Sequence, residues 1–65
     1  MNDDRKTWKF KAADGRFRVW HAGKNLYYVT DDKDGSVVGS RQHFGQAFAL
    51  ASHYQRLAKY EGAAA

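Results

Sequence analysis

Carboxylates are the groups in this chain best suited to acid–base chemistry, yet their positions do not favour catalysis. The seven acids all fall at predicted chain ends or in predicted turns: Asp3, Asp4, Asp14, Asp31, Asp32, Asp34 and Glu61. A catalytic pair needs two carboxylates held rigidly at a set separation, with pKa values pushed apart by burial. Acids in turns more often accept hydrogen bonds from backbone N–H groups. The acids therefore indicate loop structure and no general acid–base site.

The possible metal ligands and the glycines of this chain do not have the spacing of a known metal or cofactor site. The acidic loop 31–35 resembles part of an EF-hand, but its glycine would place Thr30 at the first ligand position and Arg41 where the bidentate glutamate belongs. His43 and His53 are too far apart for the i, i+4 zinc pair of a helix. The chain has no cysteine and no glycine-rich phosphate loop. We therefore predict a protein that is not an enzyme and that uses no metal or cofactor.

Positive charge beside aromatic rings is the feature that indicates a function. The chain has a net charge of +4, a pI near 9.6 and 15% aromatic residues, a balance that favours acidic partners. On one face of the predicted sheet we expect six partner-binding side chains: Lys9, Lys11, Arg16, Arg18, Trp20 and Tyr27. Lysine and arginine can meet phosphates while bases stack on aromatic rings. Aromatic residues with arginine are also typical of protein–protein hot spots.

Four strands are predicted from the period-two alternation of the first half of the chain. They span 7–13, 16–21, 26–30 and a short segment 36–39 whose register the pattern leaves open. Asp14-Gly15 is a strong hairpin signal, and we expect these two residues to be the centre of the turn, both at positive φ. This turn would pair Phe10 with Val19.

The predicted pairing also assigns a face to each strand residue. Pairing His21 with Leu26 would place Val19 opposite Tyr28 and Trp20 opposite Tyr27. The helix side would then carry Trp8, Phe10, Phe17, Val19 and Tyr28.

A helix over 41–61 is predicted from the spacing of apolar residues in the second half, with Ser40 as its N-cap and Gly62 after its last turn. Its apolar face would carry Phe44, Ala47, Phe48, Leu50, Ala51, Tyr54, Leu57 and Ala58. The sheet and the helix each have one apolar face, and each is the only element available to cover the other. We predict one α+β domain over 1–65, a three- to four-stranded antiparallel meander packed on the C-terminal helix, with frayed ends at 1–6 and 63–65.

The expected function is non-catalytic binding to a macromolecular surface. The first choice is a nucleic acid, or a complex that handles one, bound through the basic and aromatic sheet face. The predicted sheet backed by one helix resembles the arm-type DNA-binding domains of some tyrosine recombinases, at the level of fold alone and with no shared motif. The alternative is a stand-alone protein inhibitor of the phage or mobile-element type, such as an anti-CRISPR protein, acting on a host protein machine. No stretch approaches the roughly 20 apolar residues of a membrane span, and residues 1–6 lack a signal-peptide core, so we expect a cytoplasmic location.

Overall fold

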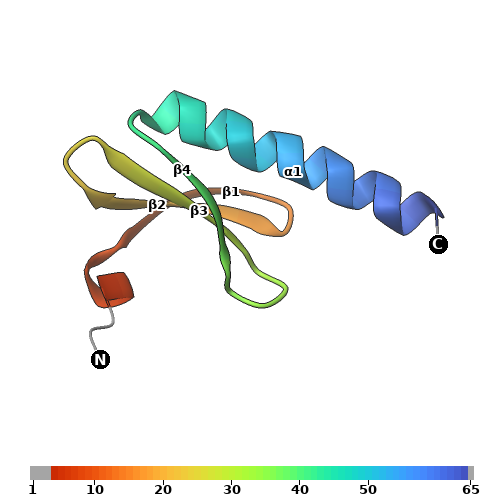
Figure 1. Cartoon of the computed structure of the whole chain (residues 1–65), viewed down its shortest axis with the longest axis horizontal. Helices are drawn as coiled ribbons and strands as arrows, with labels where there is room; N and C mark the ends of the chain where they lie inside the picture. Colours follow the sequence, from red (N-terminus) through yellow and green to blue (C-terminus); the bar gives the residue numbers. More distant parts are fainter. Residues whose placement is uncertain (1–3, 65) are drawn as a thin grey trace.

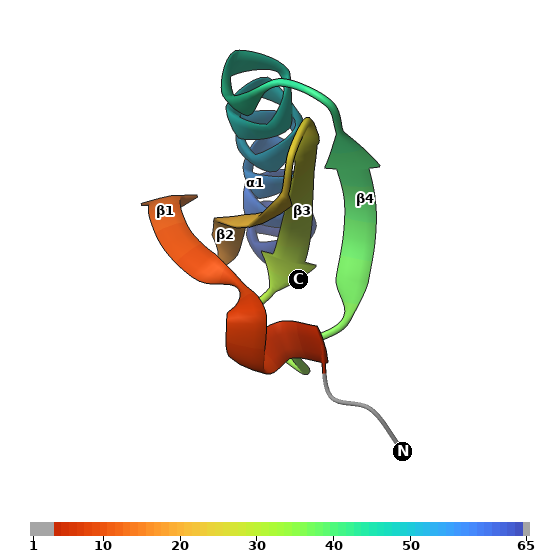
Figure 2. The same cartoon turned by 90° about the vertical axis from the view of Figure 1, so that its left-hand side faces the viewer.

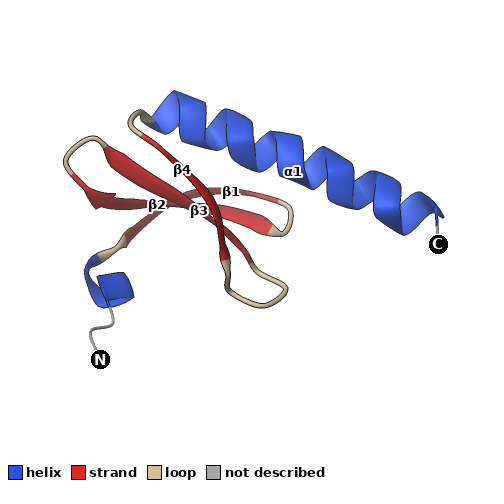
Figure 3. Ribbon diagram, in the orientation of Figure 1, coloured by secondary structure: helices blue, strands red, loops and turns tan. Residues whose placement is uncertain are grey.

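The computed structural model describes residues 4–64 and has one antiparallel sheet packed on one long helix (Figure 1, Figure 3). The elements in chain order are the 3-10 helix η1 (Asp4–Thr7), the strands β1 (Lys9–Asp14), β2 (Phe17–Gly23), β3 (Leu26–Asp31) and β4 (Val37–Arg41), and the helix α1 (Phe44–Ala64). The strands lie in the sheet in their chain order, and α1 contacts all four of them. Viewed from the end, the sheet is twisted, with β1 and β4 at its two edges (Figure 2). The predicted α+β fold is confirmed.

The core is small and is formed where β2 and β3 meet α1. Val19 and Val29 are fully buried from the sheet side, and Ala47 and Ala51 are fully buried from the helix side. Alanines on the buried face of α1 allow the helix to lie close to the sheet, and the two valines fill the space between them together with the buried Phe17. Tyr54, Leu50 and other half-buried residues pack around this centre.

The β1–β2 hairpin differs from the prediction by one residue in its turn. Asp14 pairs with Phe17, so that Gly15 and Arg16 are the two central residues. Gly15 has a φ of 61°, whereas Asp14 and Arg16 are not among the residues at positive φ. A hairpin turn with glycine at its first central position and positive φ only there is type II′. The prediction that Asp14 and Gly15 would both be central and both at positive φ is therefore wrong.

A β-bulge in β1 changes the face on which its first residues lie. Ala12 pairs with Val19, but Phe10 pairs with Trp20, which leaves Lys11 as the extra residue. A bulge of one residue reverses the alternation of side chains on the preceding part of the strand. Trp8 and Phe10 were predicted on the helix side, and this is wrong: they contact Trp20 on the other face, where Phe10 is 54% exposed.

The β2–β3 pairing also differs by one residue, with the same effect on β3. Val19 pairs with Val29 and Trp20 with Tyr28, because the turn after Gly23 has Asn25 in the left-handed conformation (φ 56°) and a bulge follows His21. Asparagine tolerates that conformation better than most residues. Tyr28 therefore lies on the face opposite α1. Tyr27 lies on the helix side, the reverse of the prediction.

The junction between β4 and α1 lies later in the chain than expected. Ser40 was predicted to cap the helix, but it pairs with Tyr28 inside β4. The helix begins at Phe44 instead of residue 41, and the carbonyl of His43 accepts the hydrogen bond of its first turn from Ala47 N–H at 3.0 Å. At its other end α1 continues through Gly62. A glycine inside a helix costs only about 1 kcal/mol.

The ends of the chain were predicted to fray. Residues 1–3 and 65 lie outside the described residues. Residues 4–6 belong to η1, and residues 63 and 64 belong to α1.

The predicted apolar face of α1 is confirmed at its centre but not at its margins. Ala47, Ala51 and Tyr54 pack against the sheet, whereas Phe48 is 36% exposed and Leu57 is 45% exposed. Figure 1 shows why the later residues are exposed: the last turns of α1 extend beyond the end of the sheet.

Candidate nucleic-acid interface

The sheet face opposite α1, here called the open face, carries four aromatic rings in mutual contact. These rings are the aromatic cluster: Trp8, Phe10, Trp20 and Tyr28. Trp8 stacks on Tyr28 with a centroid distance of 4.5 Å, and Phe10 meets Trp20 edge-on at 5.5 Å. Phe10, Trp20 and Tyr28 come from β1, β2 and β3, and Trp8 is the residue just before β1. They therefore form a continuous aromatic surface across three strands.

Trp20 lies at the centre of the aromatic cluster and is fixed by a hydrogen bond. Its indole N–H donates to the hydroxyl of Thr30, at 2.8 Å between Nε1 and Oγ1. Thr30 is buried and belongs to β3, so this bond joins neighbouring strands. A hydrogen bond to a buried partner holds the indole plane in one orientation. The cluster is therefore prearranged, which lowers the entropy lost when a partner binds.

A hollow of about 140 Å³ lies beside the cluster on the open face. Its lining combines indole rings with charged and polar groups: Trp8, Arg18, Trp20, Thr30, Asp32 and Gly35. Arg18 Nη2 lies 3.4 Å from Asp32 Oδ2, and the two side chains are 43% and 55% exposed. Charge-assisted hydrogen bonds are typically about 2.7–2.9 Å long. The Arg18–Asp32 pair is therefore a loose contact that leaves both groups accessible to solvent.

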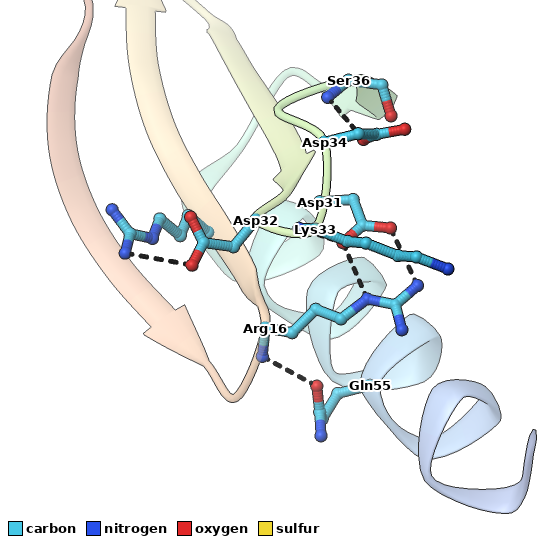
Figure 4. Close-up of polar contacts among 8 residues, drawn as sticks. Arg16, Asp31, Asp32, Lys33, Asp34, Ser36 and Gln55 are labelled. Atoms are coloured by element: carbon cyan, nitrogen blue, oxygen red, sulfur yellow. Dashed lines mark hydrogen bonds and ion pairs between the residues drawn. The ribbon is translucent and has the colours of Figure 1, made fainter. Parts of the chain in front are cut away.

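A second Arg–Asp pair on the other side of the sheet has a structural role. Arg16 donates from Nε and Nη2 to the two carboxylate oxygens of Asp31 at 2.7 and 2.8 Å, and Arg16 N–H donates to Gln55 of α1 at 2.9 Å (Figure 4). The carboxylate also accepts from the backbone N–H of Lys33. These bonds tie the β1–β2 turn to the β3–β4 loop and to the helix.

The same contacts change the acidity of the loop carboxylates. The Arg16 hydrogen bond, with help from Lys33, holds the pKa of Asp31 below its ordinary value of 3.8. Asp34 accepts a hydrogen bond from the Ser36 backbone N–H, which lowers its pKa in the same direction. Both carboxylates are therefore charged at neutral pH. Asp34 lies in the β3–β4 loop as expected, whereas Asp31, predicted in a turn, is the buried last residue of β3.

The six sequence-predicted site residues do not share one face. Arg18 and Trp20 lie on the open face as expected. Tyr27 lies on the helix side, where its ring stacks on His21 at 4.5 Å and contacts Phe44. Lys9 pairs with His21, which places it on the side of Tyr27.

The remaining two predicted residues, Arg16 and Lys11, lie at a turn and a bulge. Arg16 is bound to Asp31 on the helix side, so it does not contribute to the open face. Lys11 is the extra residue of the bulge in β1 and is exposed.

Sequence reasoning assigned three of the four cluster rings to the core. Trp8, Phe10 and Tyr28 were all placed beneath the helix, because unbroken alternation puts them on the side of Phe17. The side of the sheet on which these three rings lie depends on the bulges in β1 and β2, which the alternation does not reveal. A run of three apolar residues, Tyr27 to Val29, was the available signal that the face of β3 was uncertain.

Lysines lie along the edge of the sheet next to the cluster. Lys6 in η1 and Lys9 and Lys11 in β1 are all exposed, and no acid interrupts residues 6–13. β1 is an edge strand, and lysine on an edge also discourages pairing with other sheets. The open face thus has rings at its centre and two exposed lysines, Lys6 and Lys11, beside its β1 edge, whereas Lys9 lies on the helix side.

Neither a metal site nor a membrane-spanning helix is found in residues 4–64. This part of the chain holds no group of three histidine, cysteine or acidic side chains placed to bind a metal ion. Within it, no helix combines the length and apolar character needed to cross a membrane. Compared with protein-family models, curated proteins and solved structures, the chain matched none.

Proposed function

We propose that this chain binds single-stranded nucleic acid, without catalysis, through the aromatic cluster on its open face. Bases would stack on Phe10, Trp20 and Trp8, and phosphates would meet the exposed lysines Lys6 and Lys11 beside the β1 edge. Base–aromatic stacking contributes about 1–3 kcal/mol per base and tolerates any sequence. The observation that supports the proposal most is the gathering of four rings on the sheet face opposite α1, next to an edge strand rich in lysine.

Phe10 is the residue best suited to test this proposal. The residue is 54% exposed, which is more than a core role explains, and its ring lies edge-on to Trp20. Because more than half of the residue is exposed, removal of its side chain should leave the fold intact. A loss of binding in Phe10→Ala would then report on the interface itself.

The experiment measures fluorescence anisotropy of labelled single strands of about 12 nucleotides, as DNA and as RNA, at low salt. Phe10→Ala should weaken binding by about tenfold, which corresponds to the loss of one stacked base. Tyr60→Ala is the control, because Tyr60 is 73% exposed on α1, away from the open face. It should bind as the unaltered chain does. Absence of strand binding, or equal binding by both variants, would contradict the proposal.

A protein partner is the second candidate, and one observation favours it. Arg18 lies beside Asp32, so the middle of the open face has no net charge. Tryptophan, tyrosine and arginine together are typical of the hot spots of protein interfaces. In this case the chain would act as an inhibitor of the anti-CRISPR type, blocking a protein that handles nucleic acid. Its affinity would depend little on salt, whereas strand binding weakens steeply as salt rises.

A further inference from the structure

The hollow beside the aromatic cluster has about the volume that one flat ring needs. An apolar cavity of about 150 Å³ accommodates benzene, and this hollow measures about 140 Å³. Two of its walls are the indoles of Trp8 and Trp20, whose centroids are 6.4 Å apart and whose planes are inclined by 49°. Because the volume matches one ring, a two-ring base would enter with part of it projecting into solvent.

The polar lining of the hollow supplies one strong donor and one strong acceptor. Arg18 can only donate, through its guanidinium, and the Asp32 carboxylate can only accept, through two oxygens. The backbone N–H of Asp32 donates to the carbonyl of Arg16 at 2.8 Å, which fixes the main chain behind the carboxylate. The loose 3.4 Å contact between the two side chains costs little to break, since exposed ion pairs contribute little to stability.

We propose that this hollow binds a guanine base of the strand, an inference that rests on the proposed function. Guanine presents an acceptor, O6, next to two donors, N1–H and N2–H. Asp32 would accept from the two donors, one to each carboxylate oxygen, and Arg18 would donate to O6. The base plane would contact the indole of Trp20, which its hydrogen bond to Thr30 holds in place. Flipped single-stranded bases are commonly recognised in this way, by stacking and by hydrogen bonds to the Watson–Crick edge.

Other occupants match the lining less well. A cation such as an arginine side chain would meet the positive charge of Arg18, and an anion would meet Asp32. Adenine and cytosine each offer the carboxylate only one amino group, and thymine offers one N–H flanked by two acceptors. Among the bases, guanine alone has two adjacent donors, N1–H and N2–H, that can both bind one carboxylate. Its O6, next to them, can accept from the guanidinium.

The test compares strands that differ at one base. Three oligothymidine strands of about 12 nucleotides are used: one unaltered, one with a central deoxyguanosine and one with a central deoxyinosine. Inosine lacks the N2 amino group and therefore loses one of the two donors to Asp32. With the unaltered protein, the guanine strand should bind about tenfold more tightly than oligothymidine, and inosine should lose most of that gain.

Asp32→Asn tests the carboxylate directly. An asparagine has only one accepting oxygen, so the ratio of guanine to thymine affinity should fall to below about twofold. Asp14→Asn is the matched control: it removes the same charge, but Asp14 does not line the hollow. It should keep the tenfold ratio, because a ratio taken within one protein cancels the general effect of charge.

The outcomes separate this inference from the proposed function. If oligothymidine binds and Phe10→Ala weakens it, but guanine gives no advantage or inosine equals guanine, the base pocket is wrong and strand binding stands. An unchanged guanine advantage in Asp32→Asn would overturn the pocket in the same way. If no strand binds, both proposals fail together. The inosine comparison uses the unaltered chain, so it decides the matter even if a variant folds poorly.

Discussion

Val19 and Val29 face each other across β2 and β3, and both side chains are fully buried beneath α1. This pairing fixes the alternation of both strands, because side chains of neighbouring residues point to opposite faces. With the valines inward, Trp20 and Tyr28 must point outward. The aromatic cluster is therefore a direct consequence of which residue of β3 lies opposite Val19.

Truncation of Val29 tests this register. Val29→Ala should lower the free energy of unfolding by about 2 kcal/mol, since it removes two buried methyl groups and leaves a cavity. Val37→Ala makes the same chemical change at a side chain that is 41% exposed, and should cost no more than about 0.5 kcal/mol. Urea unfolding followed by circular dichroism measures both. Equal midpoints for the two variants would mean that Val29 is not in the core.

The turn at Gly15 provides a second test of the fold. Gly15 has positive φ, and a Cβ there would overlap the carboxamide of Gln55, which accepts the hydrogen bond of Arg16 N–H. Gly15→Val should therefore destabilise the chain by about 2 kcal/mol or more, through backbone strain and the lost hydrogen bond. Gly45→Ala is the control because its Cβ would meet nothing within 4 Å. The melting temperature should fall for Gly15→Val and not for Gly45→Ala. An unchanged melting temperature in Gly15→Val would contradict the described turn.

Acid should destabilise the chain through Asp31. Its pKa is lowered in the folded state by the Arg16 hydrogen bond, so its stabilising effect is complete above the unfolded pKa of about 3.8. The effect declines as pH falls below that value and is lost once pH passes through the lower folded pKa. Asp31→Asn should be less stable at pH 7 and should lose less stability between pH 5 and pH 2 than the unaltered chain. Melting temperatures across this range measure the difference.

Asp14→Asn is the control for the acid experiment, because it alters neither Asp31 nor Asp34. It should show the acid sensitivity of the unaltered chain, to which the lowered pKa of Asp34 also contributes. If Asp31→Asn follows the same curve as this control, the Arg16–Asp31 pair does not stabilise the fold in solution.

The order and type of the elements could be predicted from the sequence because each signal is local. Alternation in residues 7–21, a glycine at the first turn and helical spacing after residue 43 all act within a few residues. The faces of the strands could not be predicted in the same way. Each face depends on the bulges near Lys11 and Ala22, and nothing in the local composition marks them.

An error of one residue in the predicted register of β3 changes which of its side chains lie on the open face. Tyr27, Tyr28 and Val29 are consecutive and apolar, so either alternation gives a plausible buried face. The tertiary contact decides between them, because the small Val29 fits beneath Ala47 and Ala51 while a tyrosine would not. Of the predicted site, Trp20 and Arg18 remain on the open face, and Tyr27 is replaced by Tyr28.

The edge lysines should determine how strand binding depends on salt. If Lys6 and Lys11 each meet one phosphate, the double variant to glutamine should flatten the slope of log affinity against log salt by about 1.4. Lys24 and Lys59, which are exposed elsewhere, are the matched control pair and should leave the slope unchanged. Anisotropy titrations at several salt concentrations give these slopes. Equal slopes for both pairs would show that the edge of β1 does not contact the phosphates.

The central claim is that a single strand lies on the open face, and nuclear magnetic resonance tests it most directly. Oligothymidine is added to ¹⁵N-labelled protein while the indole N–H signals of Trp8 and Trp20 and the amide signals of α1 are followed. We predict that the indole signals and the amides of Phe10 and Tyr28 shift, whereas those of Ala47 and Ala51 stay in place. Shifts confined to α1, or no shift at any residue, would contradict the account.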